Sequence, residues 1–267
     1  MNQHFEWRDR EGPFRVLSNE QAEQYNRDGF VVLENVFDPE TISELIEEID
    51  PLEARMEEIV RDQFNGKAFI ARAGEITFTP HLVMESPRAK AFTQRSFFRD
   101  IAYDLLGEDV RLYWDQAVYK KPGTLERFPW HQDNGYTFIE PQQYLTCWVA
   151  LTDTDEESGC PLVMKGRHRD GTYAHTMTDL GWEIVEEAPG PVAAAPVRAG
   201  GVVVFSSLTP HKTGPNRSAD HVRKTYIVQF APEGACLRMP EGGEQLSIPC
   251  NDPERQYAIL VDGETPA

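Results

Sequence analysis

The spacing of hydrophobic residues changes near Asp109, and this change limits the folds open to the chain. Before it, hydrophobic residues recur at helical spacing, as in the stretch 42–49. After it, the period changes to two: the segment 110–120 alternates, and further strand-like segments follow at 143–151, 202–207 and 223–231, separated by connections rich in proline and glycine. Helices followed by short strands predict a mainly β fold with packed helices, a β-sandwich or jelly roll.

The order of these segments predicts one domain, residues 1–267, because no internal repeat or low-complexity linker interrupts it. We divide it into a helix-rich N-terminal part (about 14–107), a jelly-roll core (about 108–239) and a C-terminal extension (240–267). The extension is polar and rich in turn residues, so we expect an edge strand or a partly ordered tail.

Short signals predict where the first helix and strand lie. Ser18 and Gln21 have the spacing of a capping box, and Gly29 is typical of a helix C-terminus. The apolar run 30–37 then predicts a short strand.

The next helices have equally clear end signals. Asp38 is a candidate N-cap followed by Pro39, and Pro51 is expected to break or kink the helix that they begin. A second amphipathic helix is expected over 92–106, ending at Gly107.

Composition excludes several classes of protein. The chain has 26 Lys and Arg against 44 Asp and Glu, a formal charge of −18, which disfavours binding to nucleic acid. The one basic run, 165–169, is interpreted as a solvated turn. No apolar stretch reaches the roughly 18 residues of a membrane span, and the N-terminus does not resemble a signal peptide. The four cysteines form no metal or disulfide motif, and Cys147 is expected in the core, so we expect a cytoplasmic location.

Two His-x-Asp sequences are candidates for metal binding, although so short a pattern also arises by chance. His131 and Asp133 lie between two predicted strands, where alternate positions of an extended segment share one face. His168 and Asp170 lie among lysine and arginine residues, whose positive charges oppose a dication. We therefore favour the first pair and interpret His168 as a structural residue in a turn.

A third candidate ligand, His211, lies in the loop TPHKTGPN directly after the apolar segment 202–207. Two histidines and one carboxylate on one side of a metal form the facial triad that suits non-haem Fe(II) and leaves positions open for other ligands. From the residues alone, an ordinary turn histidine is an equally good interpretation of His211.

Arg223 begins the last alternating segment, on which odd-numbered residues share one face and even-numbered residues the other. A buried arginine is costly unless it is paired, and its guanidinium group suits a carboxylate. If the triad is real, that carboxylate could belong to a cosubstrate that chelates iron. An exposed Arg223 paired with a surface acid is the alternative.

Taken together, the motifs resemble the phytanoyl-CoA dioxygenase family of Fe(II)/2-oxoglutarate oxygenases. The similarity extends from about Ser18 to Phe230. It includes NEQAEQYNRDGFVVLENVFDPETISEL, then KKPG and PWHQD, then WVALTDTDEESGCPLVMKGRHRDG, PHKTGPNRS and RKTYIVQFA, in the order of the family. The resemblance implies a double-stranded β-helix (a cupin-like jelly roll) with a helical N-terminal part.

The resemblance also implies roles for individual residues. His131, Asp133 and His211 would bind iron, and Arg223 would hold the distal carboxylate of 2-oxoglutarate. Thr213 would assist Arg223, while Lys120, Gln132 and Trp148 match further positions of the cosubstrate pocket. One extra residue between Asn216 and Arg223 departs from the family pattern, which keeps Arg217 as a rival anchor.

The implied activity is oxidation, foremost hydroxylation, of a C–H bond in a small organic metabolite, with O2 consumed and succinate and CO2 released. Asp133 favours this outcome over chlorination, because halogenating relatives have a small residue there. Desaturation, ring closure and epimerisation remain open. Residues that could line the substrate pocket are Asn134, Tyr136, Phe128 and His81.

Two other functions compete with the oxygenase. One is a catalytically silent jelly-roll protein that binds a ligand, and the other is a zinc hydrolase that uses the same three ligands. In each case we expect a small-molecule partner, no nucleic acid or membrane partner, and a monomer or homodimer.

Overall fold

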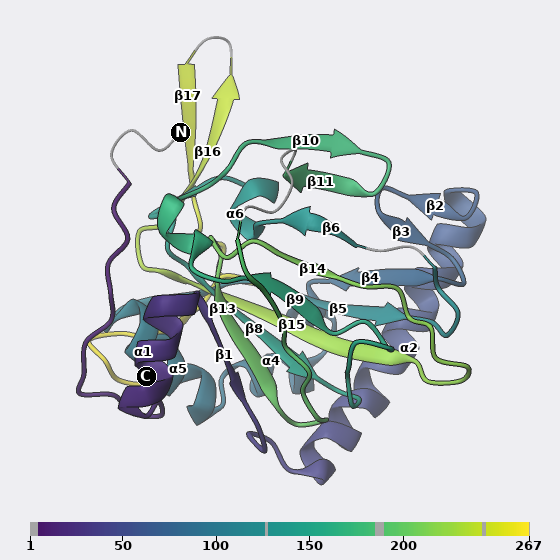
Figure 1. Cartoon of the computed structure of the whole chain (residues 1–267), viewed down its shortest axis with the longest axis horizontal. Coiled ribbons are helices and arrows are strands. Elements are labelled where there is room, and N and C mark those ends of the chain that lie inside the picture. Colours follow the sequence, from purple (N-terminus) through teal and green to yellow (C-terminus); the bar gives the residue numbers. More distant parts are fainter. Residues whose placement is uncertain (1–4, 126–127, 185–189, 242–243, 267) are drawn as a thin grey trace.

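The computed structural model describes residues 5–125, 128–184, 190–241 and 244–266, which form two facing antiparallel sheets with helices outside them (Figure 1). In spatial order the large sheet contains β1 (Phe30–Leu33), β13 (Val202–Ser206), β8 (Leu145–Ala150), β15 (Arg223–Pro232), β5 (Val110–Lys120), β4 (Ile76–Pro80), β3 (Ala71–Arg72) and β2 (Lys67–Ala68), and β18 (Ala258–Leu260) also pairs with β5. All four predicted strands are therefore found, with β5 at its predicted bounds.

A second, four-stranded sheet faces the large one. In spatial order it contains β12 (Val192–Ala194), β9 (Pro161–Met164), β14 (His211–Thr213) and β6 (Phe128–His131). Two small sheets extend it: β10 (His175–Thr178) pairs with β11 (Gly181–Ile184), and β16 (Cys236–Glu241) pairs with both β17 (Glu244–Pro249) and β7 (Ile139–Glu140). This mainly β architecture confirms the predicted jelly roll.

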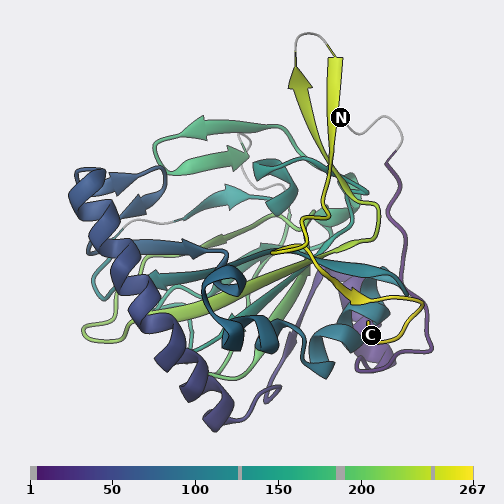
Figure 2. The ribbon, with the colours of Figure 1, turned by 180° about the vertical axis from the view of Figure 1, so that it is seen from behind.

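Most helices cover the outer face of the large sheet. Figure 2 shows α2 (Pro39–Gln63), α3 (Leu82–Glu85), α4 (Pro87–Thr93) and α5 (Ser96–Leu106) on this face. The remaining helices are α1 (Asn19–Asp28), which precedes β1, the short α6 (Asp133–Tyr136) and the 3-10 turn η1 (Arg167–Asp170).

The large sheet is buried on both faces because the helices cover one and the second sheet covers the other. In β8, Cys147 and Val149 belong to the core shared with the helices. Trp148 and Ala150 alternate with them and pack with Val163 of β9, between the two sheets. Cys147 is therefore the small core residue that the sequence predicts.

The predicted ends of the first helices are confirmed. Ser18 and Gln21 form a complete capping box at α1, and Gly29 ends this helix in the left-handed conformation, with φ of 86°. The Asp38 carboxylate accepts a hydrogen bond from the backbone N–H of Thr41, which caps α2.

Three expectations about element boundaries are wrong. The strand expected over 30–37 ends at Leu33. The break expected at Pro51 is not found, since α2 continues to Gln63 with Ile49 and Val60 buried on either side of the proline; a kink there stays a prediction.

The helix expected over 92–106 is two helices, since α4 ends at Thr93 and α5 begins at Ser96. Arg95 between them has an extended backbone conformation. The turn brings Phe92 and Phe98 to the same partner: their ring centroids lie 4.7 and 5.6 Å from that of Phe37.

The C-terminal segment is more ordered than a polar tail would be. Beyond residue 240 it supplies β17, which pairs with β16, and β18, which pairs with the start of β5. β16 itself spans the boundary that we place near residue 239.

Candidate metal centre and cavity

The two histidines of the predicted triad are brought together by strand pairing. β14 runs antiparallel to β6, and this register places His211 directly opposite His131. Asp133 follows two residues after β6, at the first position of α6. One potential ligand atom from each of the three side chains lies within 4.8 Å of the others. The sequence-predicted residues thus converge at the edge of the second sheet.

Hydrogen bonds orient both imidazole rings. Nδ1 of His131 lies 2.8 Å from the carbonyl oxygen of Pro129, and Nδ1 of His211 lies 3.0 Å from that of Thr209. A carbonyl oxygen only accepts, so each Nδ1 carries the proton and each Nε2 is left with a lone pair. Burial, followed by the neighbouring His211, holds the pKa of His131 well below its usual value, which keeps this ring neutral and able to bind a cation.

Asp133 is oriented by a relay of two polar side chains. Gln229 Nε2 donates to Thr146 Oγ1 over 3.1 Å, and Thr146 Oγ1 donates to Asp133 Oδ2 over 2.5 Å. The other carboxylate oxygen, Oδ1, lies 3.8 Å from His211 Nε2. A carboxylate held this way presents one oxygen beside two imidazole nitrogens, a donor set that fits a divalent first-row metal.

Arg223 is a buried cation without a salt bridge. Its side chain is 1% exposed, its Nε has no hydrogen-bond partner, and no ion pair of the described residues includes it. Its guanidinium carbon lies 5.4 Å from the ring centroid of Trp148. Burial lowers the pKa of Arg223 to about 10, so the group stays charged at neutral pH. Such a charge is costly unless a bound anion compensates it.

Lys120 and Thr213 lie next to this cation. Lys120 Nζ donates to Thr213 Oγ1 over 3.2 Å and to the Gly214 carbonyl oxygen over 2.6 Å. Burial, together with the charge of Arg223, strongly lowers the pKa of Lys120. Thr213, Trp148 and Arg223 line the cavity that is described below. Lys120 does not line it, but contacts it indirectly through its hydrogen bond to Thr213.

Gln132 and Asn134 are predicted to contact ligands in the pocket, but their side chains are not among the residues that line the cavity. The Gln132 amide donates to the carbonyl oxygens of Gly171 and Leu208. The Asn134 amide donates to Thr172 Oγ1 and accepts from the backbone N–H of Ile139. α6 turns the chain between these residues, so only Asp133 faces the other ligands; the neighbouring amides hold loops together.

The other predicted pocket residues divide in the same way. Phe128 and Tyr136 line the cavity. His81 does not: its ring packs against Trp114, at 4.2 Å between centroids, and its Nε2 accepts from Arg255. His81 therefore lies one layer behind the cavity wall formed by Trp114.

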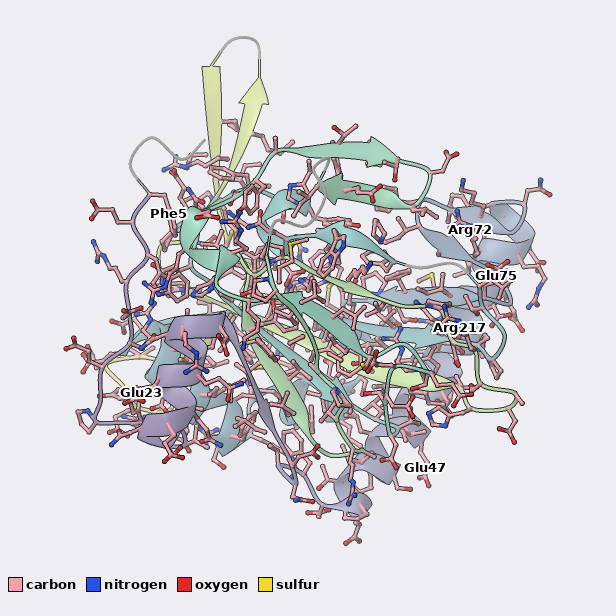
Figure 3. The ribbon with its side chains drawn as sticks, in the orientation of Figure 1. Phe5, Glu23, Glu47, Arg72, Glu75 and Arg217 are labelled. Atoms are coloured by element: carbon pink, nitrogen blue, oxygen red, sulfur yellow. The ribbon has the colours of Figure 1, made fainter. Side chains whose placement is uncertain are left out.

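The rival residues occupy other places. His168 is fully buried, with Nε2 3.2 Å from the Asn26 carbonyl oxygen and its ring edge-on to Trp7, as expected of a structural histidine. Arg217, labelled in Figure 3, is exposed in the segment between β14 and β15 and is not among the residues that line the cavity. Burial thus favours Arg223 over Arg217 as an anchor for an anion.

Sequence reasoning missed His175 on β10. Its Nε2 accepts from the backbone N–H of Gln132 over 3.0 Å, between the two candidate ligands of the His-x-Asp motif. Gly135 makes room for this ring, because a Cβ there would lie 2.0 Å from it. No local pattern around residue 175 points to this contact, which depends on the pairing of distant strands.

The triad and Arg223 line one cavity of about 640 Å³ between the sheets. Its wall also includes residues that the sequence did not reveal, from α2, the β2–β3 hairpin, β4, β5 and β11. They are mostly apolar: Met56, Ile59, Val60, Phe64, Ala68, Phe69, Ile70, Ala71, Ile76, Phe78, Pro80, Trp114, Val118 and Trp182.

Comparison with known proteins agrees with this geometry. The sequence profile of the family described as phytanoyl-CoA dioxygenase (PhyH) matches residues 25–225. The chain is 24% identical over 226 residues to a probable α-ketoglutarate-dependent hypophosphite dioxygenase of Stutzerimonas stutzeri, covering 78% of this chain and 76% of that protein. It is 26% identical over 260 residues to an ectoine dioxygenase of Bordetella bronchiseptica, covering 87% and 82%.

Solved structures share the fold. The epimerase SnoN, in complex with Fe3+, α-ketoglutarate and nogalamycin RO, superposes with a TM-score of 0.68 at 21% identity, covering 90% of this chain and 97% of that one. The carbocyclase SnoK gives a TM-score of 0.66 at 23% identity, covering 83% and 87%. Among the described helices, none is both long and apolar enough to cross a membrane.

Proposed function

The chain belongs to the phytanoyl-CoA dioxygenase (PhyH) family of Fe(II)/2-oxoglutarate-dependent oxygenases, and from this membership we propose that it oxidises, foremost by hydroxylation, a C–H bond of a small organic metabolite. The observation that carries the proposal is the buried, unpaired Arg223 in the same cavity as the His131–Asp133–His211 cluster. A metal and a dicarboxylate would together satisfy both features.

In this proposal the cluster would hold Fe(II) through Nε2 of each imidazole and a carboxylate oxygen of Asp133. The Pro129 and Thr209 carbonyl oxygens fix the two rings, and Thr146 fixes the carboxylate, so the ligands are oriented before metal binds. When bound, Fe(II) and 2-oxoglutarate supply the chemistry that activates O2 and yields succinate and CO2.

Arg223 would bind the carboxylate of 2-oxoglutarate that is distant from the metal. The guanidinium group offers parallel N–H donors to such a group, and Trp148 packs against its face. Thr213 contributes a hydroxyl at the same wall, held by Lys120. The apolar wall around these residues excludes water, which strengthens each electrostatic contact in the cavity.

A zinc hydrolase with the same ligands has less support. It would need a general base near the metal, yet Asp133, His131 and His211 are the only carboxylate or imidazole groups among the described residues of the cavity wall. A catalytically silent binding protein does not explain why a metal cluster and an arginine without an ion pair among the described residues lie in one cavity. Turnover of 2-oxoglutarate separates it from the oxygenase.

The decisive experiment is an anaerobic titration of the protein with Fe(II), with and without 2-oxoglutarate, followed by visible absorption. We expect a metal-to-ligand charge-transfer band that requires both components. Arg223→Ala should weaken the affinity for 2-oxoglutarate by about a hundredfold, because a charge-assisted bidentate contact is lost.

Arg217→Ala is the matched control, since it removes an exposed arginine of the same loop region and should leave the band unchanged. A band that persists in Arg223→Ala at unchanged 2-oxoglutarate concentration would contradict the anchor assignment. The absence of a band in the wild type, with zinc retained tightly, would overturn the oxygenase and favour the hydrolase.

We also propose that the chain works in the cytoplasm as a single-domain monomer or homodimer, with no nucleic-acid or membrane partner. The four cysteines are free thiols, as a reducing compartment would keep them. The formal charge of −18 opposes binding to nucleic acid. Fractionation of cells and size-exclusion chromatography with light scattering test these points.

A further inference from the structure

The outer part of the cavity has an apolar wall that continues to the molecular surface. α2 contributes Met56, Ile59 and Val60, and β11 contributes Trp182. Phe64 and Phe69, which also line the cavity, are 53% and 56% exposed. Large exposed aromatic side chains at the mouth of a cavity mark a surface that an apolar ligand can cover.

In the proposed function, the charged side chains of the cavity wall already bind the metal and 2-oxoglutarate. Among the described wall residues Arg223 is the only lysine or arginine, and it faces the 2-oxoglutarate carboxylate in the proposed function. Asp133 is the only acid, and it belongs to the metal cluster. A phosphate, carboxylate or ammonium group on the substrate would therefore find no oppositely charged partner among the described wall residues, which is costly in a site whose wall is mostly apolar.

One polar atom of the outer wall lacks a regular hydrogen bond. The hydroxyl oxygen of Tyr136 is buried close to the backbone of Trp182, and it makes no hydrogen bond of regular geometry to a described residue. The ring of Tyr136 is edge-on to His131, at 5.3 Å between centroids, and its hydroxyl lies beside Gly181 of β11, where a Cβ would come within 2.7 Å of it. A buried hydroxyl without a regular hydrogen bond is a place where a ligand oxygen can bind.

We propose that the substrate is an uncharged, largely apolar molecule of natural-product size, with one hydroxyl or carbonyl oxygen that meets Tyr136. A cavity of about 640 Å³ lies within the range that holds drug-sized ligands, and 2-oxoglutarate fills only part of it. The proposal rests on the proposed function only in assigning Arg223 and Asp133 to the cosubstrate and the metal.

Two fluorescent probes with the same rings test the charge rule: N-phenyl-1-naphthylamine, which is neutral, and 8-anilinonaphthalene-1-sulfonate, which adds one sulfonate. They are titrated into protein saturated with Zn2+ and 2-oxoglutarate, and quenching of Trp114, Trp148 and Trp182 reports binding in the cavity. We expect the neutral probe to bind at least about tenfold more tightly. Equal or tighter binding of the sulfonate would overturn the proposal.

A pair of variants on α2 locates the binding. Ile59→Lys places a cation in the wall, and Ala54→Lys adds the same charge at an exposed position of the same helix. Ile59→Lys should weaken the neutral probe by about tenfold or more, and Ala54→Lys should leave it unchanged. Unchanged binding in a folded Ile59→Lys would mean that the probe binds elsewhere. The wild-type comparison of the two probes stands even if this variant does not fold.

Tyr136→Phe tests the single polar contact. In wild-type protein 1-naphthol should displace the neutral probe at about one third of the concentration that naphthalene needs, or less, because of one additional hydrogen bond. In Tyr136→Phe the two compounds should be equal. Equal displacement in the wild type would overturn the role of Tyr136.

The failure of this proposal and that of the proposed function give different results. Repeating the probe titrations in metal-free Arg223→Ala that also carries Asp133→Asn removes both charges of the described wall and the need for 2-oxoglutarate, so the apolar wall is measured alone. A preference for the neutral probe there, with no iron and 2-oxoglutarate band in the wild type, would reject the oxygenase only. If the wild type shows the iron and 2-oxoglutarate band but the protein with Arg223→Ala and Asp133→Asn binds the sulfonate probe more tightly than the neutral probe, only the apolar substrate is rejected.

Discussion

The two faces of strand β15 are both buried, but they contact different surroundings. Tyr226, Val228 and Phe230 belong to the core between the large sheet and the helices, and each is 0% exposed. On the other face, Arg223, Ile227 and Gln229 line the cavity. The alternation expected from the sequence of this strand is therefore confirmed. One face packs in the hydrophobic core, and the other lines the cavity.

The difference lies in how polar groups are satisfied. On the helix face the Tyr226 hydroxyl donates to Asp115 Oδ2 over 2.9 Å, an internal partner. On the cavity face Arg223 has a charge and no ion pair with any residue that the structure describes. Burial alone thus does not mark the site; an unpaired polar group beside an open space does.

The largest effect is expected where the cavity face meets the metal cluster. Asp133→Ala removes one of three ligand side chains, so turnover of 2-oxoglutarate should fall by about a thousandfold or more, beyond the loss that removal of a supporting residue causes. The melting temperature should change little, because Asp133 is not part of the packed core. Asp170→Ala, in the other His-x-Asp sequence, is the matched control and should keep full activity. Equal losses in the two variants would contradict the assignment.

A matched pair of valines measures the stability that each face contributes. Val228→Ala, on the helix face, should lower the free energy of unfolding by about 2–3 kcal/mol, since it leaves a void in a packed core. Val118→Ala, on β5 at the cavity wall, should cost about 1 kcal/mol, because its side chain already borders open space. Urea unfolding measures both. Similar losses would show that the two faces are packed alike.

Asp115 gives the helix face a dependence on pH. Burial raises its pKa to about 6 from 3.8, so the folded protein binds this proton more tightly than the unfolded chain does. The contribution of Asp115 to stability is therefore greatest below about pH 4 and decreases on the order of 2 kcal/mol as the pH rises to 7. Asp115→Asn should flatten this part of the unfolding free energy between pH 4 and 7. An unchanged slope in that variant would place the proton elsewhere.

The smallest effect is expected in the relay behind Asp133. Thr146→Val keeps the shape of the side chain but removes the hydroxyl that bonds Asp133, so affinity for Fe(II) should fall by about tenfold. Thr225→Val makes the same change on β15, where the hydroxyl bonds only the Val149 carbonyl oxygen, and should leave the metal affinity unaltered. Calorimetric titration with Fe(II) under anaerobic conditions compares them. Equal affinities in the two variants would remove Thr146 from the site.

Much of this site could be predicted because its residues lie in short local patterns. The alternating segment 223–231 fixed which face Arg223 would share with Ile227 and Gln229. The His-x-Asp sequence and His211 carry their chemistry in their residue types. Gln132 and Asn134 lie outside the described cavity wall because α6 turns the chain directly after β6, which strand alternation cannot indicate.

The substrate side of the cavity was out of reach for a different reason. Ile59 and Val60 follow helical periodicity like any core residue of α2, so the sequence does not separate those that meet another side chain from those that border a cavity. Whether an apolar residue fills a core or leaves a space depends on what the sheet opposite it supplies. Likewise, His175 contacts Gln132 across strands that are distant in sequence.

The position of β15 has a consequence for how the protein is made. This strand comes late in the chain, yet it pairs with β8 on one side and β5 on the other. Until β15 has left the ribosome, no strand joins the half of the sheet that ends at β8 to the half that ends at β5. The unpaired edges of β8 and β5 can then form non-native pairs with other strands. The strand that joins the two halves of the large sheet is therefore also the strand that brings Arg223 into the cavity, while β18, later in the chain, still has to pair with β5.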